Sequence, residues 1–135
     1  MKKIILFLFS ALLFTGCSAE KQTTAAAYRQ ISAEEAMKLM DEQEDYIILD
    51  VRTESEYAEK HIPNAICIPN ETIGTEEIAA LPDKEQLILV YCRSGNRSKQ
   101  AAQKLADQGY TNIAEFGGIN SWPGEVVSET ANSNE

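Results

Sequence analysis

Two continuous apolar runs of strand length place the strongest constraint on the fold of this chain. They are Y-I-I-L over residues 46–49 and L-I-L-V-Y over residues 87–91. Neither run alternates between apolar and polar residues, so both are expected in a parallel sheet that is covered on both faces. Three shorter strand candidates lie at residues 29–31, 65–68 and 112–116.

Helical patterns separate these strand candidates. Ser32 with Glu35 and Thr53 with Glu56 each have the spacing of a capping box, which predicts one helix after residue 32 and a short one that ends near Lys60. Strands that alternate with helices predict an α/β domain of three layers, with a mainly parallel sheet flanked by helices. Two further helices are expected over residues 75–80 and over residues 98–108, the latter with Gly109 as its stop.

The first residues have the organisation of an export signal. Two lysines precede an apolar run of 11 residues, 4–14, which is too short to cross a bilayer as a helix. The run closes as L-F-T-G-C-S around Cys17, which resembles the lipobox of bacterial lipoproteins, with Phe14 where leucine is usual. The resemblance implies a lipid on Cys17, which would become the mature N-terminus. The alternative is an ordinary secretory signal with an incidental cysteine.

These patterns divide the chain into four parts. The expected parts are a signal peptide (residues 1–16), a flexible tether (17–27), the folded domain (28–127) and a disordered tail (128–135). The protein is then exported and anchored to a bacterial membrane by the lipid on Cys17, with its domain on the periplasmic or extracellular face.

The charge balance limits the partners of the mature protein. Removal of residues 1–16 takes away two of the 12 basic residues and none of the 21 acidic ones, which leaves a net charge of −11. Such a surface argues against nucleic acid and against an anionic lipid surface as partners. An anionic substrate would need a local cluster of cations, whose field dominates within about 8 Å at physiological salt.

Cys92 is the candidate catalytic residue. It follows the most hydrophobic strand and opens the segment C-R-S-G-N-R-S, after which a helix begins. Gly95 allows unusual backbone dihedrals, so the loop and the helix start can aim several N–H groups at one point. Arg93 and Arg97 add positive charge. These features favour an anion, and the nearest candidate is the Cys92 thiolate, whose pKa is expected to be lowered.

This arrangement predicts double displacement at sulfur. The thiolate attacks the outer sulfur of an anionic donor such as thiosulfate, and a thiophilic acceptor, cyanide or a thiol, removes the sulfur from the resulting persulfide. The reaction needs no cofactor and no proton shuttle, which agrees with a chain that has one histidine, His61. No metal is expected, because Cys67, Cys92 and His61 are too few for a structural zinc site.

Six segments spaced along the chain form a recognisable pattern: I-L-D-V-R (48–52), E-Y (56–57), H-I-P-N-A (61–65), C-R-S-G-N-R-S (92–98), G-Y-T-N-I (109–113) and G-G-I-N-S-W (117–122). In this order they resemble the single-domain rhodaneses, a family of sulfurtransferases, although Lys60 and Asn64 stand where glycine is common. The resemblance covers about residues 28–124 and implies a five-stranded parallel sheet flanked by helices. It also implies Cys67 on an outer strand, Cys92 at the tip of a central one, and no disulfide between them.

The resemblance also implies roles for individual residues. Cys92 would carry the sulfur within the loop backbone, and the side chains of Arg93 and Arg97 would bind the oxyanion of the donor. Asp50 and Arg52 would form a structural pair near the site, and His61 and Trp122 would have packing or hydrogen-bonding roles. The expected substrate-binding residues are Arg93, Ser94, Gly95, Asn96 and Arg97.

Four alternatives stay open from the sequence. Phosphatases and arsenate reductases of this fold have five residues between cysteine and arginine, whereas Cys92 and Arg97 are separated by four, which suits a single sulfur atom. A hydrolase that pairs Cys92 with His61 lacks support for its geometry. A non-catalytic binding module would not need the complete loop. A partner that accepts persulfide sulfur from another protein of the cell envelope would need the same loop as a thiosulfate enzyme.

Overall fold

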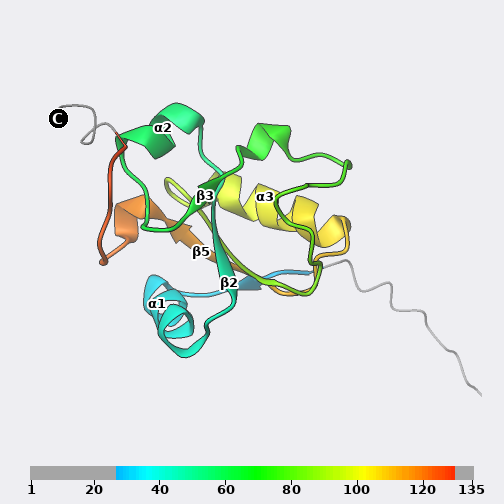
Figure 1. Cartoon of the computed structure of the whole chain (residues 1–135), viewed down its shortest axis with the longest axis horizontal. Coiled ribbons are helices and arrows are strands. Elements are labelled where there is room, and N and C mark those ends of the chain that lie inside the picture. Colours follow the sequence, from blue (N-terminus) through cyan, green and yellow to red (C-terminus); the bar gives the residue numbers. More distant parts are fainter. Residues whose placement is uncertain (1–26, 130–135) are drawn as a thin grey trace, which may run out of the picture.

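The computed structural model describes residues 27–129, which form a sheet of five parallel strands with helices on both faces (Figure 1). The expected α/β fold is therefore confirmed. The strand order is β1-β5-β4-β2-β3, so β4 is central and β3 lies at an edge. The strands are β1 (Arg29–Gln30), β2 (Tyr46–Asp50), β3 (Ile66–Cys67), β4 (Leu87–Cys92) and β5 (Ile113–Gly118).

Some of the sequence predictions concern residues that lie outside this range. They are the signal peptide (1–16), the lipidation site Cys17, residues 17–26 of the tether and residues 130–135 of the tail. Within residues 27–129, no helix is both long enough and apolar enough to span a bilayer.

Both predicted capping boxes form, and each begins a helix. The helices are α1 (Ala33–Glu42), α2 (Glu54–Glu59) and α3 (Asn96–Asp107), with short 3-10 helices η1 (Asn70–Thr72) and η2 (Ile119–Ser121). At α1, the Ser32 hydroxyl accepts a hydrogen bond from the Glu35 N–H at 3.1 Å, and the Glu35 carboxylate accepts one from the Ser32 N–H at 2.8 Å. The backbone groups at the start of the helix are satisfied in this way.

The central strand β4 is buried along its whole length, and its alternate side chains face opposite layers. One set packs in a hydrophobic cluster with Ala101, Ala102 and Leu105 of α3, and the other in a cluster with Ala36 of α1. This two-sided burial explains the continuous apolar run. It also places Cys92 on the α3 side of the sheet, beside the start of that helix. The two sets are Ile88, Val90 and Cys92 on the α3 side, and Leu87, Leu89 and Tyr91 on the α1 side.

The helix predicted over residues 75–80 is wrong, because that segment consists of bends and turns. Leu81 precedes Pro82, which disfavours the helical conformation of the residue before it. The segment is fixed by packing instead: Leu81 is buried in the α3-side cluster, and its carbonyl accepts a hydrogen bond from the Tyr110 hydroxyl at 2.6 Å. A turn buries Leu81 here, with its N–H donating to the Ile78 carbonyl at 3.0 Å, and the helical turn forms earlier, at η1.

Helix α3 begins at Asn96, two residues before the predicted start at Ser98. Gly95 precedes it with φ of 113°, a left-handed conformation that glycine adopts without strain. The chain therefore turns from β4 into α3 over only three residues, 93–95. The short turn brings the start of the helix close to Cys92.

Candidate active site

The Cys92 sulfur lies in a cradle of hydrogen-bond donors at the carboxyl end of β4. Its Sγ accepts a hydrogen bond from the Gly95 N–H at 3.0 Å, and the Ser98 Oγ lies 3.4 Å away. The backbone N–H groups of Ser94 and Ser98 also face the sulfur. The short turn thus aims its amides at the thiol, as the sequence predicted.

The pKa of the Cys92 thiol is lowered from its ordinary value. Burial raises the pKa, because it disfavours the charged form. Hydrogen bonds from the loop and the helix start, among them those of the Ser98, Gly95 and Ser94 N–H groups, lower it and outweigh the effect of burial. A thiol in this position favours the anionic, nucleophilic form.

Cys92 is only 1% exposed, and the loop that covers it is at the surface. Arg93, Ser94 and Asn96 are exposed, whereas Gly95 is buried. The sulfur is therefore buried next to a loop that is itself at the surface. A reactant has to reach it with a small or narrow group.

The loop fits against the end of β5 because Gly118 has no side chain. A Cβ atom on Gly118 would lie 2.0 Å from the Arg93 carbonyl oxygen and 2.3 Å from its carbon. The same carbonyl accepts a hydrogen bond from the Asn120 N–H at 3.3 Å. The second glycine of the G-G pair thus allows the close approach that holds the cradle in place.

The two arginines of the loop have different surroundings. Arg97 forms a bidentate ion pair with Glu56 of α2, at 2.7 Å and 3.0 Å. The hydrogen bond from Arg97 lowers the pKa of Glu56 to about 2, and the same bond raises the pKa of Arg97. Arg93 is exposed and faces a polar cavity of about 300 Å³. The cavity is lined by Arg52, Glu56, Glu59, Lys60, Arg93, Ile119 and Asn120.

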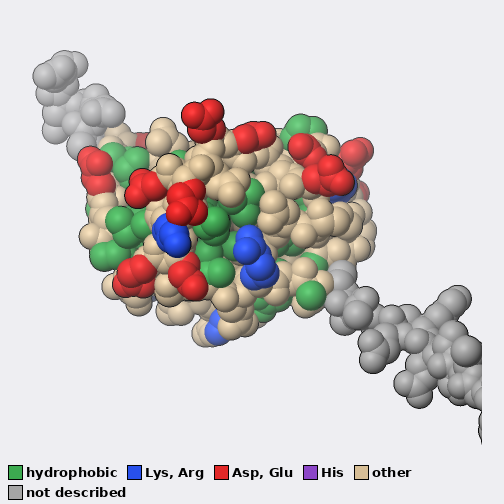
Figure 2. Space-filling view, turned by 90° about the horizontal axis from the view of Figure 1, so that it is seen from below, with side chains coloured by type: hydrophobic (Ala, Val, Ile, Leu, Met, Phe, Trp, Pro, Cys, Tyr) green, Lys and Arg blue, Asp and Glu red, His purple; other side chains and the backbone are tan. Residues whose placement is uncertain are grey.

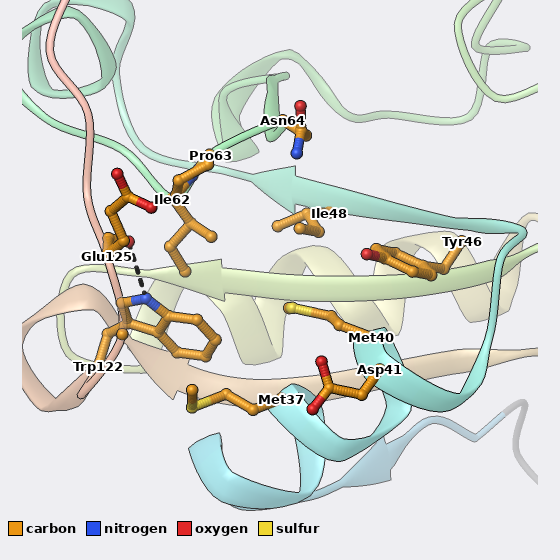
Figure 3. A pocket seen from close by; sticks show the side chains of 11 residues that line it. Met37, Met40, Asp41, Tyr46, Ile48, Ile62, Pro63, Asn64, Trp122 and Glu125 are labelled. Atoms are coloured by element: carbon orange, nitrogen blue, oxygen red, sulfur yellow. Dashed lines mark hydrogen bonds between the residues drawn. The ribbon is translucent and has the colours of Figure 1, made fainter.

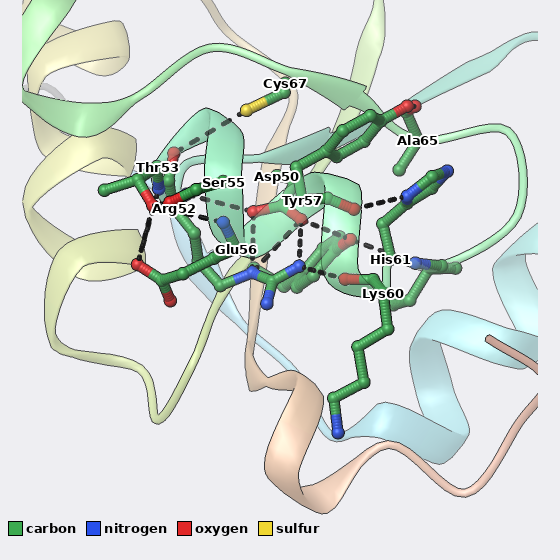
Figure 4. Close-up of polar contacts among 12 residues, drawn as sticks. Asp50, Arg52, Thr53, Ser55, Glu56, Tyr57, Lys60, His61, Ala65 and Cys67 are labelled. Carbon is green, nitrogen blue, oxygen red and sulfur yellow. Dashed lines mark hydrogen bonds and ion pairs between the residues drawn. The ribbon is translucent and has the colours of Figure 1, made fainter. Parts of the chain in front are cut away.

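Asp50 and Arg52 form a buried ion pair beside the site (Figure 4). The Arg52 Nη2 lies 2.6 Å from the Asp50 Oδ2, and it also donates to the Lys60 carbonyl at 2.7 Å. The Tyr91 hydroxyl donates to the Asp50 Oδ2 at 2.7 Å. Burial lowers the pKa of Arg52, and the contact with Asp50 raises it by more. The pair thus joins the end of β2 to β4 and to the end of α2.

Sequence reasoning missed three residues of this site. Glu56 was assigned to a capping box and to a segment of the family resemblance, and its contact with Arg97 was not predicted. Glu115 is 2% exposed, and its Oε1 accepts hydrogen bonds from the Ser98 hydroxyl at 2.6 Å and the Gly117 N–H at 2.8 Å. The available signal for Glu115 was one acidic residue within the apolar run I-A-E-F of a predicted strand. Ser98 was expected as the last residue of the loop motif and the first residue of a helix, and its contacts with Cys92 and Glu115 were not predicted.

His61 and Cys67 lie apart from the cradle. The His61 ring stacks on Tyr57 with 3.7 Å between ring centroids, and its Nδ1 lies 2.7 Å from the Tyr57 carbonyl oxygen. Cys67 lies on the edge strand β3, as expected, and burial raises its pKa to about 11. Cys67 and Cys92 are both free thiols. In residues 27–129, no group of three or more His, Cys, Asp or Glu side chains could hold a metal ion.

A second cavity, of about 210 Å³, lies on the α1 side of the sheet (Figure 3). Met37 and Met40 of α1 face Trp122 across it, and Trp122 packs on Phe116 with 5.5 Å between ring centroids. Figure 2 views the molecule from the α1 side and shows acidic side chains over much of that face. The Cys92 side chain faces the opposite layer, so this groove is separate from the cradle.

Comparisons with known proteins agree on one family. A family model described as the rhodanese-like domain matches residues 32–125, and a model of the prokaryotic membrane lipoprotein lipid attachment site matches residues 1–18. The thiosulfate sulfurtransferase GlpE of Coxiella burnetii is 36% identical over 108 residues, which cover 79% of this chain and 98% of that protein. The thiosulfate sulfurtransferase PspE of Escherichia coli is 37% identical over 71 residues, which cover 53% of this chain and 68% of that protein.

Solved structures show the same similarity. The structure described as rhodanese with anions from E. coli has a TM-score of 0.57 and 36% identity, and the match covers 62% of this chain and 98% of that one. A rhodanese-like domain protein from Staphylococcus aureus has a TM-score of 0.62 and 30% identity, over 72% of this chain and 93% of that one.

The buried ion pair leads to a prediction about stability. Asp50→Ala should lower the free energy of unfolding by about 3–5 kcal/mol, because it leaves the Arg52 guanidinium buried without its counter-charge. Urea unfolding of the two proteins measures the difference. Glu42→Ala is the control, since it removes one partner of the exposed Lys38–Glu42 pair and should cost no more than about 0.5 kcal/mol. Equal effects of the two substitutions would show that the buried pair is not a main support of the fold.

The contact of Gly118 leads to a prediction about the cradle. Gly118→Ala should push the loop away from β5, because the new Cβ would meet backbone atoms of Arg93 that cannot rotate aside. The Cys92 pKa should then rise, and the protein should lose about 1–3 kcal/mol of stability. The pH dependence of Cys92 alkylation and thermal unfolding test this. In the control Gly74→Ala, the new Cβ has no atom within 4 Å, and both quantities should stay unchanged.

Proposed function

The chain belongs to the rhodanese-like domain family, and from this premise we propose that it is a sulfurtransferase that carries sulfane sulfur as a persulfide on Cys92. The observation that carries the proposal is the set of donors around the Cys92 sulfur, with the Gly95 N–H at 3.0 Å. Relatives named thiosulfate sulfurtransferases support it, because GlpE matches over 98% of its own length.

The first half of the reaction loads the sulfur. The Cys92 thiolate attacks the outer sulfur of thiosulfate, a new S–S bond forms, and the bond to the sulfonate sulfur breaks as sulfite leaves with the electron pair. The negative charge of the thiolate passes to the terminal sulfur of the persulfide. The backbone N–H groups of the loop are rigidly placed, so they stabilise this charge without reorganising.

The second half removes the sulfur. A thiophilic acceptor, cyanide or a thiolate, attacks the terminal sulfur, and the electron pair of the S–S bond returns to the Cys92 Sγ. The thiolate in its cradle is regenerated. Neither half-reaction requires this chain to donate or remove a proton, so His61 can remain bound to Tyr57.

The substrate-binding residues follow from the surroundings of the loop. They are the loop residues Arg93, Ser94, Gly95, Asn96 and Arg97, of which Ser94 and Gly95 turn their N–H groups toward the sulfur. Arg93 has the better position to bind the sulfonate oxygens of the donor, because it is exposed beside the polar cavity. Arg97 is already neutralised by Glu56, so it contributes less positive charge to an anionic donor.

A protein persulfide is a second candidate for the donor, and the Arg97–Glu56 pair favours it. With one of the two arginines occupied, the site holds less free positive charge for a dianion such as thiosulfate. A protein persulfide also presents its outer sulfur on a narrow group, as the depth of Cys92 requires. The chemistry at Cys92 would be the same for both donors.

The cell envelope is the proposed location. The match to a lipoprotein attachment site over residues 1–18 supports a lipid on Cys17. Two or three acyl chains anchor a protein stably, whereas one binds only marginally. We expect the domain on the periplasmic or extracellular face.

Mass spectrometry of the peptide that contains Cys92 tests the proposed function. The full-length protein in detergent should gain the mass of one sulfur atom on this peptide after treatment with thiosulfate, and cyanide should remove it. Cys92→Ser should abolish the gain, and Cys67→Ser is the control that should retain it. An unmodified Cys92 in a protein that hydrolyses a phosphate ester would overturn the proposal.

The different surroundings of the two arginines give a kinetic prediction. Arg93→Ala should raise the KM for thiosulfate roughly tenfold, because a charge-assisted hydrogen bond contributes about 1.5–3 kcal/mol. Arg29→Ala removes the same charge from β1 and should leave the KM unchanged. Steady-state kinetics at low salt measures both. If Arg93→Ala had no effect on KM while the persulfide still formed, the donor would not be bound through Arg93.

A further inference from the structure

We propose that Glu115 is a positioning residue, which competes with the Cys92 thiolate for the single proton of the Ser98 hydroxyl and so keeps the carrier sulfur nucleophilic. The proposal rests on the proposed function, because it concerns the same sulfur. Glu115 does not touch the substrate. It acts through Ser98, and the two residues lie on β5 and α3, 17 positions apart in the sequence.

The Ser98 oxygen carries one proton and has three oxygen acceptors around it. The Cys92 sulfur donates to this oxygen as a thiol and becomes a fourth acceptor as a thiolate. The closest is the Glu115 Oε1 at 2.6 Å, then the Gly95 carbonyl oxygen at 2.9 Å, the Gly117 carbonyl oxygen at 3.3 Å and the Cys92 sulfur at 3.4 Å. A hydroxyl can direct its proton at only one acceptor fully. A carboxylate at 2.6 Å forms a short, charge-assisted hydrogen bond. The proton therefore favours Glu115, and the lone pairs of Ser98 face Cys92.

Burial makes this competition effective. Ser98 is fully buried and Glu115 is 2% exposed. The donors to Glu115 in the described part of the chain are the Ser98 hydroxyl and the Gly117 N–H. In residues 27–129 the ion pairs join other residues, so no cation neutralises Glu115. Electrostatic interactions are stronger in such buried surroundings than in water, because the local dielectric constant is lower.

The carboxylate also opposes the thiolate directly. The contacts that each makes with the Ser98 oxygen place the Glu115 Oε1 within 6.0 Å of the Cys92 sulfur. A like charge at this distance disfavours the anionic form of a thiol. The backbone N–H groups lower the Cys92 pKa, and Glu115 limits how far it falls.

The other charged groups around Cys92 are paired or exposed. The main partner of Arg97 of α3 is Glu56 of α2, and the charges of Cys92 and of Glu71 in η1 also act on Arg97. Arg93 of the loop is exposed. At the end of β2, Asp50 and Arg52 neutralise each other. Within the described structure, Glu115 is the carboxylate that is connected to the Cys92 sulfur by a single hydroxyl group, that of Ser98.

The pairing has opposite effects on the two half-reactions. In the thiolate the negative charge lies on the Cys92 Sγ, and in the persulfide it lies on the terminal sulfur, farther from Glu115. Glu115 therefore raises the free energy of the thiolate relative to the persulfide. A thiol of higher pKa is the better nucleophile and the poorer leaving group. The pairing favours loading and retention of the sulfur, and the Ser98 proton stays on Ser98 throughout.

The test measures the Cys92 pKa in three variants of the full-length protein in detergent. The readout is the pH dependence of iodoacetamide alkylation, followed on the peptide that contains Cys92. Glu115→Gln should lower the pKa by about one, because it removes the like charge and weakens the competitor for the proton. Ser98→Ala alone should change the pKa little. The same substitution added to Glu115→Gln should raise the pKa again, since the freed hydroxyl then donates to the thiolate.

Separate half-reactions give a second readout. In Glu115→Gln, loading by thiosulfate at a pH well above the pKa should slow about threefold, as expected for a thiolate whose pKa is lower by one. Discharge of the persulfide to cyanide should become faster. A purely structural role would slow both steps or neither. Glu125→Gln makes the same chemical change on an exposed residue and should alter no readout.

Two results would overturn the proposal. The first is an unchanged or raised Cys92 pKa in a folded Glu115→Gln protein. The second is a Cys92 pKa that rises by about one in Ser98→Ala alone, because Ser98 would then already donate to the sulfur; this result decides the case even if Glu115→Gln does not fold. Alkylation needs no turnover, so the test separates this proposal from the proposed function, which fails if Cys92 takes up no sulfur.

Discussion

A negative charge on a buried sulfur is the constraint on which the rest of this site depends. Cys92 is 1% exposed, and burial alone would raise its pKa. Hydrogen bonds compensate here, and the turn between β4 and α3 supplies them from its own backbone. That turn needs the left-handed Gly95 and a position at Gly118 without a side chain. The loop sequence, the glycine pair and the start of α3 all help to stabilise negative charge on the Cys92 sulfur.

The arginines near the site contribute less free positive charge to the sulfur anion than their number suggests. Arg52 is paired with Asp50, and Arg97 with Glu56, so two of the three guanidinium groups around the loop are neutralised. A chain with a net charge of −9 can therefore hold a sulfur anion without a basic surface. The paired arginines join β2, α2 and α3 around the loop, and the backbone amides stabilise the charge.

The sequence predicted local features of the fold and site, and missed features that depend on distant pairs. The buried strands, both capping boxes and the place of Cys92 follow from patterns within a few residues. The helix expected over residues 75–80 did not form, because Tyr110 and the core fix Leu81 in a segment of bends and turns. The pairs Glu56–Arg97 and Ser98–Glu115 join residues 41 and 17 positions apart. Spacing along one sequence does not report such pairs.

Glu115 lowers the stability of the fold. This cost is the strongest reason to connect the residue with the chemistry at Cys92. A buried carboxylate with two neutral donors and no cation costs free energy, and an apolar side chain on β5 would avoid that cost. The carboxylate also lies beside a thiolate that the loop is built to stabilise. These two effects oppose each other at the same atom, so the free energy of the thiolate is held between limits. A sulfur carrier needs a thiolate of intermediate stability. A thiolate that is stabilised too well attacks its donor slowly and loses the bound sulfur too easily.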